Sequence, residues 1–122
     1  MKTILIVDDQ MEVRELVDVT LSADEIRIIK ASKGKEAVEI ARREKPDLII
    51  MDVMMPGKLN GIEATRILKS DETTRHIAIL MLTAKGQDRD VEAGLKAGAD
   101  AYFVKPFSPL ELIRKVEEVL ES

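Results

Sequence analysis

The chain has 122 residues, of which 45% are hydrophobic and 34% are charged, a balance that fits one domain of ordinary size with its own core. Its 19 basic and 23 acidic residues give a net charge of −4, which argues against direct nucleic-acid binding, because such binding depends largely on clustered lysines and arginines. There is no cysteine and only one histidine, His76, which excludes disulfides and metal sites built from thiolates or from several histidines.

Apolar runs alternate with helical patterns along the chain. Strands are predicted, in order, at residues 3–7, 26–30, 47–51, 77–82 and 101–104. Helices are predicted between and after them, at residues 10–22, 35–44, 61–70, 88–98 and 108–122. The third and fourth apolar runs are almost uninterrupted, which is typical of strands covered on both faces of a sheet. Arg27, in the second run, indicates an edge strand.

Local signals support the predicted helices. The first helical segment places a stripe of side chains at helical spacing, namely Val13, Leu16, Val17, Thr20 and Leu21. Asn60 suits the N-cap of the third helix. At the start of the fifth helix, Ser108 and Glu111 form a capping box, and Pro109 suits the first helical position.

Five strands that alternate with five helices predict a parallel sheet with helices on both faces, an α/β doubly wound (βα)5 sandwich. No linker separates the segments, and the fifth helix runs to the last residue. We therefore expect a single domain, 1–122, with no output domain in this chain. No apolar stretch approaches the roughly 20 residues of a membrane span, and no signal peptide is visible, so we expect a cytoplasmic protein.

Polar residues follow four of the five predicted strands. They are Asp8 and Asp9 after the first strand, Asp52 after the third, Thr83 and Ala84 after the fourth, and Lys105 with Pro106 after the fifth. The carboxyl ends of parallel strands meet at one edge of a sheet. If the first and third strands are neighbours, Asp8, Asp9 and Asp52 converge there.

Three converging carboxylates would repel one another unless a cation lies among them. Oxygen ligands alone suit a hard ion such as Mg²⁺, for which Mn²⁺ could substitute. Lys105 would offer a positive charge to a phosphate, and the Thr83 hydroxyl a hydrogen bond. This combination is typical of a phosphoryl-transfer site, and because its only nucleophile is a carboxylate, the product would be an aspartyl phosphate.

Four motifs in order, "VDD", "DVMMPG", "LTA" and "YFVKPF", resemble those of the receiver domain of two-component response regulators, including the chemotaxis receivers. The resemblance covers essentially all 122 residues and implies a flavodoxin-like fold with strand order 2-1-3-4-5. It implies that the protein is a signalling switch, not an enzyme in the ordinary sense, and that Asp52 is the phosphoacceptor. Asp9, Asp52 and the backbone carbonyl of Met54 would bind Mg²⁺ directly, and Asp8 mainly through water.

The same resemblance assigns the remaining site residues. Lys105, the Thr83 hydroxyl and the backbone N–H of Ala84 would bind the phosphoryl group, and the peptide between Lys105 and Pro106 would be cis. Thr83 and Tyr102 would move together on phosphorylation and alter the face formed by the fourth helix, fifth strand and fifth helix.

The implied partners follow from that mechanism. A sensor histidine kinase or a histidine phosphotransfer protein would donate the phosphoryl group, and a downstream protein would bind the altered face. Dimerisation on activation would be compatible with the pattern.

Two departures from the family pattern stand out. The loop at 57–60 is one residue longer than usual, which affects its expected shape. Met54 and Lys85 occupy the positions that tune hydrolysis of the acyl phosphate in the family, and neither offers a carboxylate or an amide to place a water. This favours slow self-dephosphorylation.

Simpler interpretations remain open for each residue alone. Asp9 with Glu12 fits an acidic helix N-cap, Asp52 could begin a turn, Thr83 could end a strand and Lys105 could be a surface charge. For the whole chain, the alternatives are a degenerate receiver that acts only as a docking module, a Mg²⁺-dependent aspartyl phosphatase and a flavin- or nucleotide-binding module. A phosphatase would generally need an acid where Met54 stands, and a nucleotide module a glycine-rich loop after the first strand.

Overall fold

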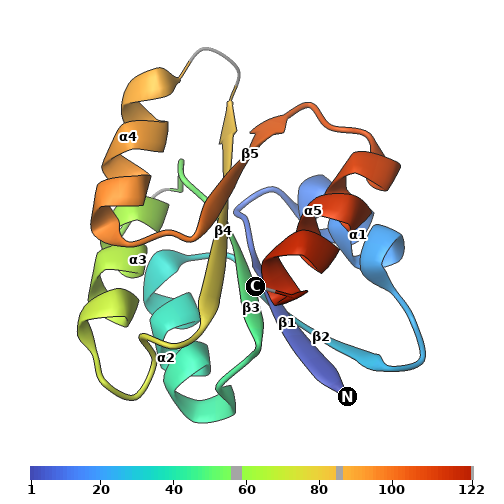
Figure 1. Ribbon diagram of the computed structural model, residues 1–122, viewed down its shortest axis with the longest axis horizontal. Coiled ribbons are helices and arrows are strands. Elements are labelled where there is room, and N and C mark those ends of the chain that lie inside the picture. Colours follow the sequence, from blue (N-terminus) through green and yellow to red (C-terminus); the bar gives the residue numbers. More distant parts are fainter. Residues whose placement is uncertain (56–58, 85–86, 122) are drawn as a thin grey trace.

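The structure is a computed structural model that describes residues 1–55, 59–84 and 87–121. Its strands are β1 (Lys2–Val7), β2 (Ile26–Ala31), β3 (Leu48–Asp52), β4 (Ala78–Ala84) and β5 (Ala101–Lys105). Its helices are α1 (Met11–Leu21), α2 (Gly34–Glu44), α3 (Gly61–Ser70), α4 (Asp88–Ala97) and α5 (Pro109–Glu121). Strand and helix alternate along the whole chain (Figure 1), as the sequence pattern predicts.

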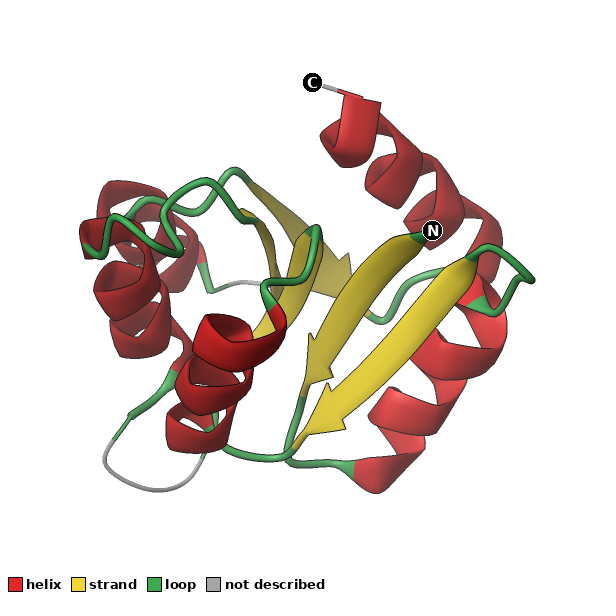
Figure 2. Ribbon diagram, turned by 90° about the horizontal axis from the view of Figure 1, so that it is seen from below, coloured by secondary structure: helices red, strands yellow, loops and turns green. Residues whose placement is uncertain are grey.

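The five strands form one parallel sheet in the order β2-β1-β3-β4-β5. Helices α1 and α5 cover one face of this sheet, and α2, α3 and α4 cover the other (Figures 1 and 2). The predicted doubly wound (βα)5 sandwich and strand order are therefore confirmed, and β2 lies at an edge as Arg27 indicated. No helix within the described residues is both long and apolar enough to span a bilayer.

The sheet separates two hydrophobic cores, because alternate residues of each strand point to opposite faces. On the α2–α3 side the buried strand residues are Leu5, Val7, Ala31, Ile49, Met51, Ile79 and Met81. On the α1–α5 side they are Ile4, Ile6, Leu48, Ile50, Leu80 and Leu82. All five residues of β3 are buried, which explains why this strand reads as an uninterrupted apolar run.

Three strands continue past the end of their apolar runs. β3 extends through Asp52, β4 through Thr83 and Ala84, and β5 through Lys105. The last of these pairs directly with Ala84 in the β4–β5 register. The hydrogen bonds between strands join backbone groups and do not depend on the polarity of the side chains. The strands therefore include the polar residues that the sequence pattern had assigned to the segments after them.

Two predicted helix caps are present. The Asn60 side chain accepts a hydrogen bond from the Glu63 backbone N–H at 2.9 Å, and the Ser108 hydroxyl accepts one from the Glu111 N–H at 3.2 Å. One core prediction is wrong. Leu16, which helical spacing places on the apolar stripe of α1, is exposed, and the buried residues of this helix are Val17 and Leu21.

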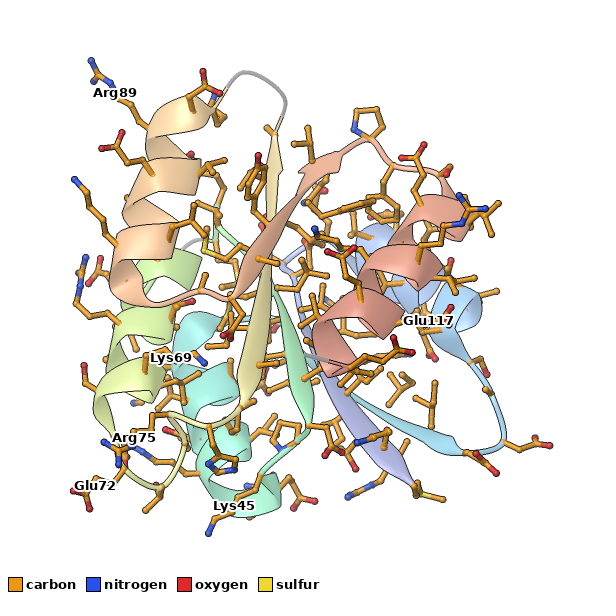
Figure 3. The ribbon with its side chains drawn as sticks, viewed as in Figure 1. Lys45, Lys69, Glu72, Arg75, Arg89 and Glu117 are labelled. Atoms are coloured by element: carbon orange, nitrogen blue, oxygen red, sulfur yellow. The ribbon has the colours of Figure 1, made fainter. Side chains whose placement is uncertain are left out.

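At the amino ends of β4 and β5, Lys69 joins three segments of chain. Its ammonium donates to the carbonyl oxygens of Arg75 and Ile77 at 3.1 and 2.7 Å, and it pairs with the Asp100 carboxylate at 2.9 Å. Lys69 and Arg75 lie in the lower half of Figure 3, whereas the carboxyl ends of the strands point toward its top. This ion pair therefore braces the sheet at the edge opposite the predicted site.

Candidate functional site

The sheet register brings the acidic residues together. β1 and β3 are hydrogen-bonded neighbours with Val7 opposite Met51, so Asp8 and Asp52 follow at the same level of adjacent strands. One carboxylate oxygen from each of Asp8, Asp9 and Asp52 lies within 4.8 Å of the other two. The predicted convergence of these side chains is confirmed.

The three carboxylates differ in their access to water. Asp8 is fully buried and Asp52 is 5% exposed, whereas Asp9 is exposed. Asp52 is held at the end of a fully buried strand, so its backbone cannot move away from Asp8 without disturbing the core. The cluster is thus open on the side of Asp9 and closed on the side of the sheet.

Lys105 bridges the two buried carboxylates. Its Nζ lies 3.1 Å from Oδ2 of Asp8 and 3.2 Å from Oδ1 of Asp52. Burial lowers the pKa of the Lys105 ammonium, but the nearby Asp52 and Asp8 carboxylates raise it more, so that the pKa lies above its ordinary 10.5. The lysine is therefore charged at every physiological pH, and its peptide bond to Pro106 is cis, as predicted.

The electrostatics of Asp52 are set mainly by its burial. Burial and, to a smaller extent, the negative charge of Asp8 raise the pKa of Asp52, Lys105 and a backbone hydrogen bond with Met54 oppose the rise, and the net result is a pKa of about 6 against an ordinary 3.8. At pH 7 and above Asp52 is mostly ionised, so its oxygens are available as ligands or as a nucleophile. One ammonium among three carboxylates leaves the cluster with an excess of negative charge, and oxygen donors of this kind fit a hard divalent cation.

Asp8 is fixed by groups on the turn that follows β1. Its Oδ1 accepts the Gln10 backbone N–H at 2.9 Å, and its carbonyl oxygen accepts a hydrogen bond from Arg14 Nη1 at 2.7 Å. The sequence pattern placed Arg14 outside the apolar stripe of its helix and gave no sign of this contact. The interpretation of Asp9 as the N-cap is wrong, because Gln10 is the N-cap residue of α1 and has no side-chain capping bond.

The Thr83 hydroxyl has no protein partner in the described parts of the chain. Thr83 is 2% exposed, and its Oγ1 makes no hydrogen bond there, although buried polar atoms are nearly always paired. A small pocket of about 180 Å³ lies between α4 and β5, and the residues that line it include Thr83, Ala84 and Tyr102. Tyr102 itself is 42% exposed. A buried donor beside a pocket is suited to a ligand that accepts a hydrogen bond.

The loop after β3 approaches the site closely. A Cβ at Gly61 would overlap the carbonyl oxygen of Asp52, and the Gly61 N–H donates to Val53 at 3.1 Å. The Met54 side chain is 67% exposed and does not fill the core. The predicted extra residue of the loop at 57–60 and the position of Lys85 fall partly or wholly outside the described residues.

Comparison with known proteins agrees with this geometry. Residues 4–117 match the response regulator receiver domain family. The phosphate regulon transcriptional regulatory protein PhoB of Pseudomonas aeruginosa is 46% identical over 119 residues, covering 98% of this chain and 52% of that protein. The alkaline phosphatase synthesis transcriptional regulatory protein PhoP of Bacillus subtilis is 44% identical, covering 98% and 48%. The chain thus spans about half the length of these relatives.

Solved structures give the same result. A putative response regulator from Chloroflexus aurantiacus superimposes with a TM-score of 0.93 at 36% identity, covering 99% of this chain and 98% of that one. The receiver domain of a sensor histidine kinase from Pseudomonas aeruginosa, solved with a magnesium ion coordinated in its active site cleft, gives 0.89 at 33% identity, covering 99% and 98%. By sequence and by fold, this chain belongs to the response regulator receiver domain family.

Proposed function

We propose that Asp52 accepts a phosphoryl group from a phosphohistidine of a histidine kinase or of a histidine phosphotransfer protein. Receiver domains are phosphorylation-dependent signalling switches, and Asp52 would be the residue that is phosphorylated in this receiver domain. The observation that carries it is the contact of a single lysine, Lys105, with both Asp8 and Asp52 at 3.1 and 3.2 Å, beside the exposed Asp9.

A divalent cation completes the proposed site. Asp8, Asp9, Asp52 and the backbone carbonyl of Met54 would hold Mg²⁺, or Mn²⁺ in its place, with Asp8 acting mainly through water. The fit rests on the donor set: three carboxylates with one oxygen each inside 4.8 Å, and no nitrogen or sulfur ligand among the residues that the proposal assigns to the cation. When bound, the ion would neutralise carboxylate repulsion and offset charge on the incoming phosphoryl oxygens.

The chain's own residues have distinct tasks in the transfer. A carboxylate oxygen of Asp52 forms a bond to phosphorus while the P–N bond of the donor imidazole breaks, and the electron pair stays on the imidazole nitrogen. Lys105 is placed to attract the phosphoryl oxygens. The orphan hydroxyl of Thr83 and the backbone N–H of Ala84 would each donate a hydrogen bond to them.

The signal would leave the site through Thr83 and Tyr102. When the Thr83 hydroxyl turns toward the phosphoryl group, the pocket between it and Tyr102 changes shape, and the tyrosine ring can enter. The face made by α4, β5 and α5 would change accordingly. This face exposes Leu95, Tyr102 and Val104, which suits a downstream protein partner or a second activated copy.

In this proposal residues 1–122 act as one receiver domain. The transcriptional roles printed for PhoB and PhoP belong to those proteins, of which this chain matches about half. Nothing in the proposed chemistry requires a nucleic acid.

Intact-protein mass spectrometry tests the assignment. The protein is incubated with Mg²⁺ and acetyl phosphate, and we expect a single phosphoryl gain that disappears with EDTA and in Asp52→Ala. Asp24→Ala, at an exposed carboxylate before β2, serves as the matched control and should be labelled like the wild type.

Two results would contradict the proposal. A gain that persists in Asp52→Ala would assign the phosphoryl group to another residue. The absence of any gain, both from acetyl phosphate and from a histidine kinase, would leave the docking-module interpretation.

A further inference from the structure

We infer that Arg14 is a positioning residue for the cation: it fixes the turn between β1 and α1 so that Asp9 is presented to the metal. The inference rests on the proposed Mg²⁺ site. It assigns a role to a residue outside the set of ligands and phosphoryl-binding groups.

The contact is short and partly buried. Arg14 Nη1 donates to the carbonyl oxygen of Asp8 at 2.7 Å, a length typical of a strong, charge-assisted hydrogen bond. The same aspartate accepts the Gln10 N–H at Oδ1 and the Lys105 ammonium at Oδ2. Asp8 is therefore held at its backbone and at both carboxylate oxygens.

The carbonyl that Arg14 binds belongs to the peptide bond between Asp8 and Asp9. Asp9 makes no hydrogen bond and no ion pair within the described part of the chain, and its side chain is exposed. Within the described chain, the backbone is therefore the part of Asp9 through which the protein directs its carboxylate. The orientation of the preceding peptide plane, which Arg14 holds, decides where that backbone directs the side chain.

Arg14 differs from the arginines on the surface. Arg27, Arg42 and Arg43 pair with the carboxylates of Glu44 or Asp71, and each has more than half of its side chain exposed. Among the described residues, Arg14 pairs with no carboxylate, although the carbonyl that it binds belongs to Asp8, a member of the acidic cluster. It adds positive charge next to Asp8 and does not itself occupy a carboxylate oxygen of the cluster.

This arrangement matches the general behaviour of metal sites, in which groups that orient a ligand affect metal affinity without touching the metal. A merely structural arginine would affect the stability of the fold and leave Mg²⁺ affinity unchanged. A positioning arginine affects Mg²⁺ affinity even in a variant that stays folded.

The test compares three variants of the 122-residue chain in a Mg²⁺ titration that is followed by the backbone amide NMR signals of Asp9 and Gln10. Arg14→Met keeps an unbranched, flexible side chain but removes the charge and the donors. Arg14→Lys keeps the charge and one donor. Arg27→Met, which removes a surface ion pair with Glu44, is the matched control.

We expect Arg14→Met to bind Mg²⁺ about tenfold more weakly than the wild type, the size of effect seen when a group that orients a metal ligand is lost. Arg14→Lys should recover most of the affinity, and Arg27→Met should bind like the wild type. At saturating Mg²⁺ the rate of phosphorylation of Arg14→Met should return close to the wild-type rate. The Gln10 amide signal of the metal-free Arg14→Met should also shift, because the turn that it joins has moved.

If Arg14→Met binds Mg²⁺ as tightly as Arg27→Met, the inference is wrong even though the site stands. If the wild type itself binds no Mg²⁺, the proposed function fails and takes the inference with it. Should Arg14→Met not fold, Arg14→Gln replaces it, with weakened binding again expected and wild-type affinity again contradicting the role.

Discussion

Replacing Asp52 with asparagine should stabilise the metal-free domain at neutral pH, although it removes the proposed reacting group. Burial and the neighbouring Asp8 raise the pKa of Asp52 to about 6, against an ordinary 3.8. The folded protein therefore binds this proton more tightly than the unfolded chain does. Ionised Asp52 therefore lowers the free energy of unfolding relative to a domain in which this side chain is neutral.

The magnitude follows from the pKa difference. Each pH unit between the folded and unfolded values corresponds to about 1.4 kcal/mol, so the full cost is about 3 kcal/mol. Because Asp52 is only 5% exposed, solvent screens little of it. Stability falls as the pH rises from about 4 to about 6, and the cost is complete above that window.

Asparagine has a similar shape and cannot ionise. In EDTA at pH 7.5 we expect Asp52→Asn to unfold at a temperature roughly 10 °C higher than the wild type, given the usual relation between free energy and melting temperature for a domain of this size. Near pH 4 the two proteins should unfold at nearly the same temperature. Thermal circular dichroism at both pH values measures the difference, with Asp24→Asn as the control.

The reasoning is refuted if Asp52→Asn gains nothing at pH 7.5, or if it gains as much at pH 4. The first outcome would mean that Lys105 fully compensates the buried charge. The second would mean that packing, and not ionisation, explains the gain.

Three further predictions concern the surroundings of Asp52. Asp9→Asn should abolish most of the Mg²⁺ binding measured by calorimetry. The free energy of unfolding in EDTA should stay within about 0.5 kcal/mol of the wild type, since an exposed side chain contributes little to the fold; a large loss of stability would favour a structural role for Asp9. Gly61→Ala should lower the free energy of unfolding in urea by about 1–3 kcal/mol and slow labelling by acetyl phosphate, because the added methyl group displaces the Asp52 carbonyl. The control Gly94→Ala, whose methyl group meets the end of a flexible methionine side chain, should be labelled at the normal rate. Thr83→Val should raise stability by about 1 kcal/mol in the metal-free protein by removing an unpaired buried hydroxyl; no gain would show that the hydroxyl is hydrated.

The fold was predictable because each element carries its own period. Continuous apolar runs identify β3 and β4, and the 3.6-residue spacing identifies the helices. The order of the strands is a different matter: it came from the family resemblance, since nothing in the local patterns decides which strand lies beside β1.

The set of site residues was also predictable, for a topological reason. In a parallel sheet every strand ends at the same edge, so Asp8, Asp52 and Lys105 were expected at one edge once the strands were recognised. The strand order, which the family resemblance implies, then places β1 beside β3 and brings Asp8 next to Asp52. Side-chain partnerships were not predictable in this way. That Lys105 binds both aspartates depends on the register Ala84–Lys105 between the last two strands, which no sequence pattern displays.

Local patterns were weakest at the start of α1. The Asp9–Glu12 pair fits a capping signature, yet the helix begins at Met11 after Gln10, one residue later than that signature requires. Helical spacing likewise assigned Arg14 to the polar side of the helix. It could not show that this side lies beneath the end of β1, where a carbonyl needs a donor.

The two adjacent aspartates thus have different dependences on the cation. Each oxygen of Asp8 already accepts a hydrogen bond. The Gln10 N–H and the Lys105 ammonium donate to its two carboxylate oxygens, and Arg14 donates to its backbone carbonyl. Asp9 has none of these within the described chain. A metal-free protein can therefore keep Asp8 in place, whereas Asp9 gains its partner only when the cation arrives. Because Mg²⁺ typically binds through only one or two carboxylates, the loss of Asp9 should be felt in metal affinity and the loss of Asp8 in the fold as well.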